Sequence, residues 1–375
     1  MEHKTSLAFV NLRAKAQKGG QEVTINNLID GLKEYYDIKY IGHPSDVNYK
    51  KVVFPFTPLL KLVPIKKGFG RLLRVSVFRY LFLRKIELNC DIIVVNGKSD
   101  YTFLLRNKKT IRFNKVLVIK HGKFVSPYPN SIINDKDYRI VVLNSNELNE
   151  LEHKYKKENL KLIRTGTKYN KKSTEVIDVR AKFNIPHDAY IILSIGRLEE
   201  EQKRFSLGIR AIRYALQKNE KIFYIIVGNG PSKPKYNKMI KKLNLTNNIK
   251  LLGNISEEDK NGLLRISNLL LITSLWETLG LTMVEAFRMG VPVLTTKTNG
   301  STDVVEEEYN GFYTTDEAKD LADKILKISN LPKEKTKEII ENAHKTAELY
   351  SYDKMIDSYR EVINDIINDD YNSKG

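Results

Sequence analysis

The sequence contains very little cysteine and no long uncharged hydrophobic run. Its 375 residues include a single cysteine, Cys90, so no disulfide can form within the chain, and a reducing cytosolic compartment is expected. No apolar run approaches the roughly 20 residues that a helix needs to span a bilayer, and no secretory signal with a cleavage site is visible. With 20 Gly and 11 Pro, the composition also excludes a collagen-like chain. The length instead predicts a globular protein of two domains.

Acidic residues are missing from one long segment. The formal net charge is +18, and residues 1–170 carry almost all of it, with 32 Lys and Arg against 15 Asp and Glu. Residues 47–86 contain ten basic side chains among Phe, Leu and Val and no acidic one, a mixture that suits an anionic membrane surface. The alternatives are a helix with solvated cations or a nucleic-acid surface; no zinc-finger or RNA-binding signature supports the latter, so no nucleic-acid partner is expected. The cations predicted to contact the membrane are Lys61, Lys66, Lys67, Arg71, Arg74 and Arg79.

Short, apolar, β-branched segments alternate with segments of helical periodicity in both halves of the chain. Such repeated units predict an α/β fold with two doubly wound Rossmann-like domains of parallel strands and a cleft between them. Strands are expected at residues 6–12, 38–41, 92–95, 116–119, 140–143 and 160–164, and again at 189–194, 222–227, 249–252, 269–272 and 291–295.

Two carboxylates, Glu277 and Glu285, flank a predicted helix start in the segment that follows residues 269–272. Gly280 has no Cβ, and Leu281 and Thr282 open the helix, where unpaired N–H groups favour phosphate. Eight residues along a helix would separate the carboxylates by about 12 Å. One carboxylate could then bind hydroxyls on one side of a pyrophosphate and the other carboxylate hydroxyls on the far side, which suits a nucleotide sugar. The alternative is a chance pair on a solvated helix.

Two cations, Arg197 and Lys203, follow the predicted strand at residues 189–194. Ligands of open α/β sheets bind at the carboxyl ends of strands, so these cations could hold a pyrophosphate there. Alternatively, they form solvated pairs of little energetic value with the glutamates at positions 199–201.

Several motifs in order give the second half a family resemblance. Gly196-Arg197-Leu198, Gly228-Asn229-Gly230-Pro231, the segment from Ser274 to Glu285, Gly290-Val291-Pro292-Val293 and Asn310-Gly311 follow one another. Together they resemble the retaining nucleotide-sugar glycosyltransferases of family 4, which have the GT-B fold. The resemblance is specific over residues 190–312 and weaker before them. It implies an acceptor domain over residues 1–167, a donor domain over 168–345, and a C-terminal helix over 346–375 that packs back on the first domain.

The resemblance also implies residue roles. Arg197 and Lys203 would hold the donor pyrophosphate, Glu285 the ribose hydroxyls, and Glu277 the donor sugar. The catalytic set is then Glu277, His121, Arg197 and Lys203, and the other donor-binding residues are Gly20, Gly228, Gly280, Leu281, Thr282 and Glu285. From the residues alone, His121 could be structural and the Gly228 segment only a turn.

Two departures from the family pattern are visible. Lys203 stands six residues after Arg197 where five is commoner, so Arg204 is an alternative contact. The expected hinge, at Thr165-Gly166-Thr167, lacks the family's usual Asn before the glycine.

The implied reaction is leaving-group catalysis, in which cations and helix-start amides stabilise the departing diphosphate. No Asp-x-Asp or His/Asp metal cluster occurs, so no cofactor and no metal are expected. The prediction is a cytoplasmic, membrane-associated hexosyltransferase that moves a sugar from a UDP-sugar to a lipid-linked or growing cell-surface polysaccharide. The alternatives are a GT-B nucleotide-sugar epimerase or hydrolase, and a non-enzymatic basic protein that binds membrane or nucleic acid.

Overall fold

The computed structural model describes residues 4–11, 20–42, 88–96, 111–120, 138–168 and 178–372. Two compact units divide the chain: unit 1 comprises residues 1–163 and 355–375, and unit 2 comprises residues 164–354. The sequence-based boundaries lay at residues 167 and 346. The six cations predicted to meet a membrane and the predicted catalytic His121 lie outside the described residues.

Unit 1 is built on a parallel sheet whose described strands run in the order β2-β1-β3-β4-β5-β6. The strands are rich in Val and Ile and are buried, as expected for a parallel sheet covered on both faces. The strands are β1 (Ser6–Asn11), β2 (Asp37–Gly42), β3 (Leu88–Asn96), β4 (Ile111–Ile119), β5 (Tyr138–Val142) and β6 (Leu160–Leu162). The described helices of this part are α1 (Gly20–Leu32), α4 (Ser145–Glu152) and the short η4 (Lys157–Asn159).

The last helix of the chain, α14 (Tyr352–Asn372), belongs to unit 1 from Met355 onward. The Tyr36 hydroxyl donates to Asn364 Oδ1 at 3.2 Å, and the Arg360 guanidinium lies 3.7 Å from the centre of the Tyr35 ring. The C-terminal helix therefore packs on the first unit although most of its sequence neighbours belong to the second.

Unit 2 contains a second parallel sheet, in the order β12-β11-β10-β7-β8-β9. Taken in sequence this is the Rossmann strand order, and the direction of winding reverses between β7 and β10. The strands are β7 (Tyr190–Ile195), β8 (Ile222–Val227), β9 (Ile249–Gly253), β10 (Leu269–Ile272), β11 (Val293–Thr296) and β12 (Gly311–Thr314). The helices are α5 (Val179–Lys182), α6 (Glu200–Lys203), α7 (Phe205–Ala215), α8 (Lys233–Lys242), α9 (Glu257–Ile266), α10 (Leu281–Arg288), α11 (Ser301–Val304), α12 (Ala318–Ser329) and α13 (Lys333–Glu348).

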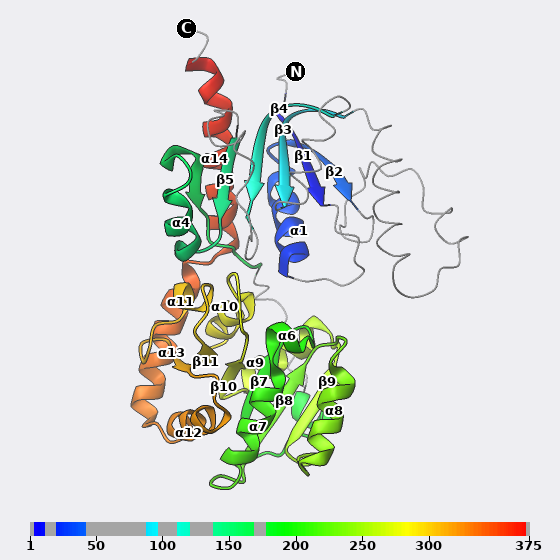
Figure 1. Cartoon of the computed structure of the whole chain (residues 1–375), viewed down its shortest axis with the longest axis vertical. Helices are drawn as coiled ribbons and strands as arrows, with labels where there is room; N and C mark the ends of the chain where they lie inside the picture. The colour runs from blue at the N-terminus through cyan, green and yellow to red at the C-terminus, as the bar shows by residue number, and fades with distance from the viewer. Residues whose placement is uncertain are drawn as a thin grey trace, which may run out of the picture. The chain divides into compact units, whose positions relative to one another are not determined.

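Successive residues of β7 point into two different cores. Ile191 and Leu193 join a cluster with α9, α10 and α13, whereas Ile192 joins one with α7, α8 and α12. Figure 1 labels these helices and most strands of the sheet. This alternation covers both faces of the sheet with helices. The predicted α/β fold with two doubly wound parallel sheets is confirmed.

Unit 2 holds its first and last residues side by side. Thr167 pairs with Ser351 in an isolated parallel bridge. From α10, the Arg288 guanidinium donates to the carbonyl oxygens of Thr167 at 2.7 Å and Tyr350 at 2.6 Å. The two segments at which the chain enters and leaves unit 2 are thus tied to one helix of that unit.

Candidate functional site

The carboxyl ends of β7 and β10 bring two of the predicted residues together. Lys203 Nζ lies 2.5 Å from Glu277 Oε1, and the Ser274 hydroxyl donates to the same oxygen at 2.6 Å. The Glu277 side chain is only 9% exposed and that of Lys203 is 20% exposed. A carboxylate and an ammonium group therefore face each other at the point where the winding of the sheet reverses, the usual ligand position in such folds.

The loop that carries Glu277 is held by hydrogen bonds from both sides. The Leu275 amide donates to the Gln202 carbonyl at 2.8 Å, and Gln202 Nε2 donates to the Trp276 carbonyl at 3.2 Å. On the other side, the Gly300 amide donates to the Glu277 carbonyl at 2.9 Å. These contacts fix the position of the carboxylate before any ligand arrives.

Arg204 has a different environment from its neighbour Lys203. Its backbone is left-handed, with φ of +47°, at the junction of α6 and α7. Its side chain donates to the carbonyl oxygens of Thr273 at 2.9 Å and Ser274 at 3.2 Å, and to Asp316 at 2.7 Å. Arg204 therefore holds the end of β10, while Lys203 is the cation that meets Glu277.

Arg197 lies on the surface after β7. Its guanidinium is 3.4 Å from Glu199 Oε2, and the side chain is 40% exposed. This is the solvated pair that the sequence left open as an alternative. No described contact joins Arg197 to Lys203 or Glu277, so the structure does not bring all the predicted cations together.

Gly228 follows β8 and packs against the loop after β7. Its φ is +139°, and a Cβ there would lie 1.8 Å from the Gly196 carbonyl oxygen. Only glycine fits so close a backbone approach. This packing explains the glycine without any ligand, and donor binding by Gly228 stays a prediction.

Helix α10 begins without a side-chain cap. Gly280 precedes it in the left-handed conformation, with φ of +71°, so the chain turns sharply into the helix. The first amides of a helix, here those of Leu281 and Thr282, have no partner within it and favour anions. The helix start follows Glu277 directly in the loop, as the sequence predicted.

Glu285 on α10 forms an ion pair that sequence reasoning missed. Its carboxylate lies 3.1 Å from Lys260 on α9, and Lys260 also contacts Glu257 at 2.7 Å. Burial raises the pKa of Glu285 above the ordinary glutamate value, although attraction to Lys260 opposes the rise. Burial alone would lower the pKa of Lys260, but Glu285 and Glu257 leave it raised. No sequence spacing signals this pair, because it joins two separate helices.

Gly20, the predicted donor contact in the first half, is the first residue of α1 in unit 1.

None of the described helices is both long and apolar enough to cross a membrane. Within the described ranges, no three His, Cys, Asp or Glu side chains gather as a group that could hold a metal ion.

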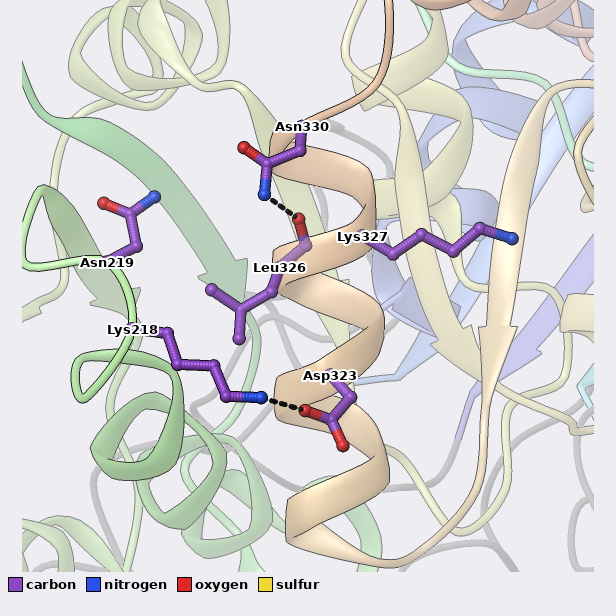
Figure 2. A pocket seen from close by; sticks show the side chains of 6 residues that line it. All are labelled: Lys218, Asn219, Asp323, Leu326, Lys327 and Asn330. Atoms are coloured by element: carbon purple, nitrogen blue, oxygen red, sulfur yellow. Dashed lines mark hydrogen bonds and ion pairs between the residues drawn. The ribbon is translucent and has the colours of Figure 1, made fainter.

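A surface pocket of about 350 Å³ lies elsewhere on unit 2 (Figure 2). In it, Lys218 pairs with Asp323 at 3.3 Å, and Asn330 Nδ2 donates to the Leu326 carbonyl at 3.0 Å. The lining residues come from α12, from Asn330 just after it, and from the segment after α7. Because these helices return the chain to the amino ends of the strands, this pocket is at the opposite edge from Lys203 and Glu277.

Residues 175–346 match the model of the family "Glycosyl transferases group 1". An uncharacterized glycosyltransferase of Methanocaldococcus jannaschii is 37% identical over 113 residues, which cover 30% of this chain and 27% of that protein. A second uncharacterized glycosyltransferase of that organism is 26% identical over 93% of this chain and 95% of its own length. The poly(ribitol-phosphate) alpha-N-acetylglucosaminyltransferase of Staphylococcus aureus is 25% identical over 63% of this chain and 56% of its length.

Solved structures share this fold over most of the chain. Sucrose-phosphate synthase from Thermosynechococcus elongatus has a TM-score of 0.75 at 18% identity, with 97% of this chain and 100% of that chain covered. HepE from Anabaena, in complex with UDP-glucose, has a TM-score of 0.73 at 18% identity with the same coverage. The fold is therefore the GT-B fold that the sequence predicted.

Proposed function

We propose that this chain is a group 1 glycosyl transferase, the family whose model residues 175–346 match, and that it transfers a sugar from a UDP-sugar to a lipid-linked or growing cell-surface polysaccharide. The observation that carries the proposal is the contact of Lys203 with Glu277 where β7 and β10 end. The bound UDP-glucose of the Anabaena protein supports a UDP-sugar. The poly(ribitol-phosphate) named for the staphylococcal relative supports a cell-surface polymer as acceptor.

The chemistry proposed for the donor is departure of its diphosphate. Lys203 and Arg197 and the first amides of α10 would stabilise the charge that develops on the leaving group. Because Lys and Arg provide this charge, we propose that the reaction needs no divalent metal and no other cofactor.

Glu277 is proposed to orient the donor sugar and not to attack it. One of its oxygens already accepts from both Lys203 and Ser274, which holds the carboxylate in place and weakens it as a nucleophile. Attack by the acceptor on the face that the diphosphate leaves would then retain the anomeric configuration, with the proton passing to the donor phosphate.

Glu285 is proposed to accept hydrogen bonds from the ribose hydroxyls. Acceptance at both oxygens requires the ionised carboxylate. Lys260, at 3.1 Å, favours that form against the effect of burial.

The test is transfer from a panel of UDP-sugars by Glu277→Gln and Arg197→Ala, with UDP-dependent thermal stabilisation as a separate readout. Both variants should lose nearly all transfer while keeping the melting temperature of the free protein. Lys218→Ala, in the exposed pair at the opposite edge, is the matched control and should transfer normally. Normal transfer by Glu277→Gln would disprove the assignment, and rapid donor turnover without any acceptor would favour a hydrolase or epimerase.

The acid-free segment at residues 47–86 motivates a second part of the proposal, association with the inner face of the cell membrane. Flotation with vesicles rich in phosphatidylglycerol should weaken as salt rises, because surface cations are screened. Replacing Lys61, Lys66 and Lys67 together by Gln should weaken it further. Flotation that is unaffected both by salt and by the triple substitution would contradict a charge-dependent membrane contact.

A further inference from the structure

Two large apolar side chains are exposed beside Glu277. Leu275 is 52% exposed, and Trp276, the only tryptophan of the chain, is 37% exposed. In the same loop Leu279 is only 4% exposed. The loop therefore buries one apolar side chain and presents two others to solvent.

This presentation is held in place by the protein. The Leu275 amide and the Trp276 carbonyl are both bonded to Gln202, and the next carbonyl, that of Glu277, accepts from Gly300. An exposed apolar residue on a surface is ordinary, but here the backbone on both sides is anchored. An anchored backbone reduces the conformational entropy that is lost when a ligand packs on the ring.

The charges around the patch indicate which ligand it suits. Gln202 belongs to α6, where Glu199, Glu200 and Glu201 precede it. The nearby cations are already engaged, Lys203 with Glu277 and Arg204 with Asp316. Glu199 and Glu200 are paired in turn, with Arg197 and Lys235. Because the described charges beside the patch are thus mostly balanced, this surface has little attraction for an anionic lipid surface. It is compatible with a neutral sugar ring, whose C–H face packs on an indole while its hydroxyls stay in water.

We propose that Trp276, with Leu275 beside it, is the platform on which a sugar ring of the acceptor stacks. The inference rests on the proposed function, in which Glu277 holds the donor sugar. The residue next to Glu277 then lies at the sugar end of the donor, whereas the nucleoside end lies towards Glu285. A ring on Trp276 is therefore the acceptor's, and not the base of the nucleotide.

The single tryptophan allows binding to be read directly in the unmodified protein. Selective excitation of tryptophan should give a saturable change in emission when methyl glycosides of glucose, galactose or N-acetylglucosamine are added in the presence of UDP. UDP alone should give a much smaller change. In transfer assays, Trp276→Ala should raise the acceptor KM about tenfold and leave UDP affinity within about twofold, whereas Trp276→Phe should retain most acceptor affinity.

Tyr309→Ala is the matched control, because Tyr309 is an aromatic residue of similar exposure, 38%, away from this loop. Tyr309→Ala should leave both the acceptor KM and the UDP affinity unchanged. The inference is overturned if no glycoside alters the emission, if UDP alone produces the full change, or if phosphatidylglycerol vesicles do so instead. A failure of transfer with every donor, together with glycoside-dependent emission, would count against the proposed function but not against the platform.

Discussion

Replacing Arg204 tests whether this cation supports the site or binds the donor. Arg204→Ala removes hydrogen bonds to the Thr273 and Ser274 carbonyls and the ion pair with Asp316. The Asp316 side chain is 61% exposed, so that pair contributes less than about 1 kcal/mol. The Thr296 hydroxyl also donates to the Ser274 carbonyl, so that carbonyl keeps a hydrogen-bond partner in the variant. The substitution therefore affects mainly the Thr273 carbonyl. Since hydrogen bonds to a charged group contribute about 1.5 to 3 kcal/mol each, the substitution should destabilise unit 2 by about 2 to 4 kcal/mol.

The left-handed backbone conformation of Arg204 allows a second, independent prediction of folding stability. A side chain at a φ of +47° costs about 1 to 2 kcal/mol, which glycine avoids at some cost in chain entropy. Arg204→Gly should therefore be about 0.5 to 1 kcal/mol more stable than Arg204→Ala. Urea denaturation followed by circular dichroism measures both differences, with Asp316→Ala as the control that removes only the exposed pair. Unchanged stability of Arg204→Ala with lost UDP binding would refute the reasoning and make Arg204 a diphosphate contact.

Two further predictions concern the donor site. Because the pKa of Glu285 is raised in the folded protein, its carboxyl takes up a proton on acidification earlier than an ordinary glutamate. UDP affinity should fall as the pH is lowered through that raised pKa, and calorimetric titration of UDP at several pH values measures this. Any folding stability gained from the protonated carboxyl is lost as the pH rises through the same pKa. The variant Glu285→Gln should bind UDP weakly at every pH, with no such pH dependence. Wild-type protein that has been dialysed against EDTA should transfer sugar as fast as undialysed protein. Activity that EDTA abolishes and that Mg²⁺ or Mn²⁺ restores would contradict a reaction driven by Lys and Arg alone.

Most of the fold was predictable because it depends on local patterns. Short β-branched runs between helical segments are a property of the sequence itself, and parallel pairing follows from the connections. The edge strand β12 was missed because it has only four residues and its first residue, Gly311, follows Asn310 in a pair typical of turns. The helix start at Gly280 was predicted from glycine and from the apolar periodicity that follows it.

The side-chain partners were much less predictable. Lys203 and Glu277 are 74 residues apart and were placed in one site only through the family resemblance. The pair of Lys260 with Glu285 joins two helices that meet only through the packing of α9 and α10 in one core. Nothing in the spacing of these residues encodes that packing, so no sequence pattern could have identified Lys260.

Adjacent residues with the same charge have different roles at this site, and backbone conformation explains the difference. Lys203 ends α6, and Arg204 turns the chain in a left-handed conformation before α7 begins. That turn sends the two side chains to different parts of the loop after β10, one to the Glu277 carboxylate and the other to the Thr273 and Ser274 carbonyls. The same loop is therefore fixed by Arg204 and charge-balanced by Lys203. A cation that already binds three oxygens must break those bonds to meet a ligand, whereas Lys203 need only shift from one anion to another. The geometry thus favours Lys203 over Arg204 as the donor contact, although the sequence left both open.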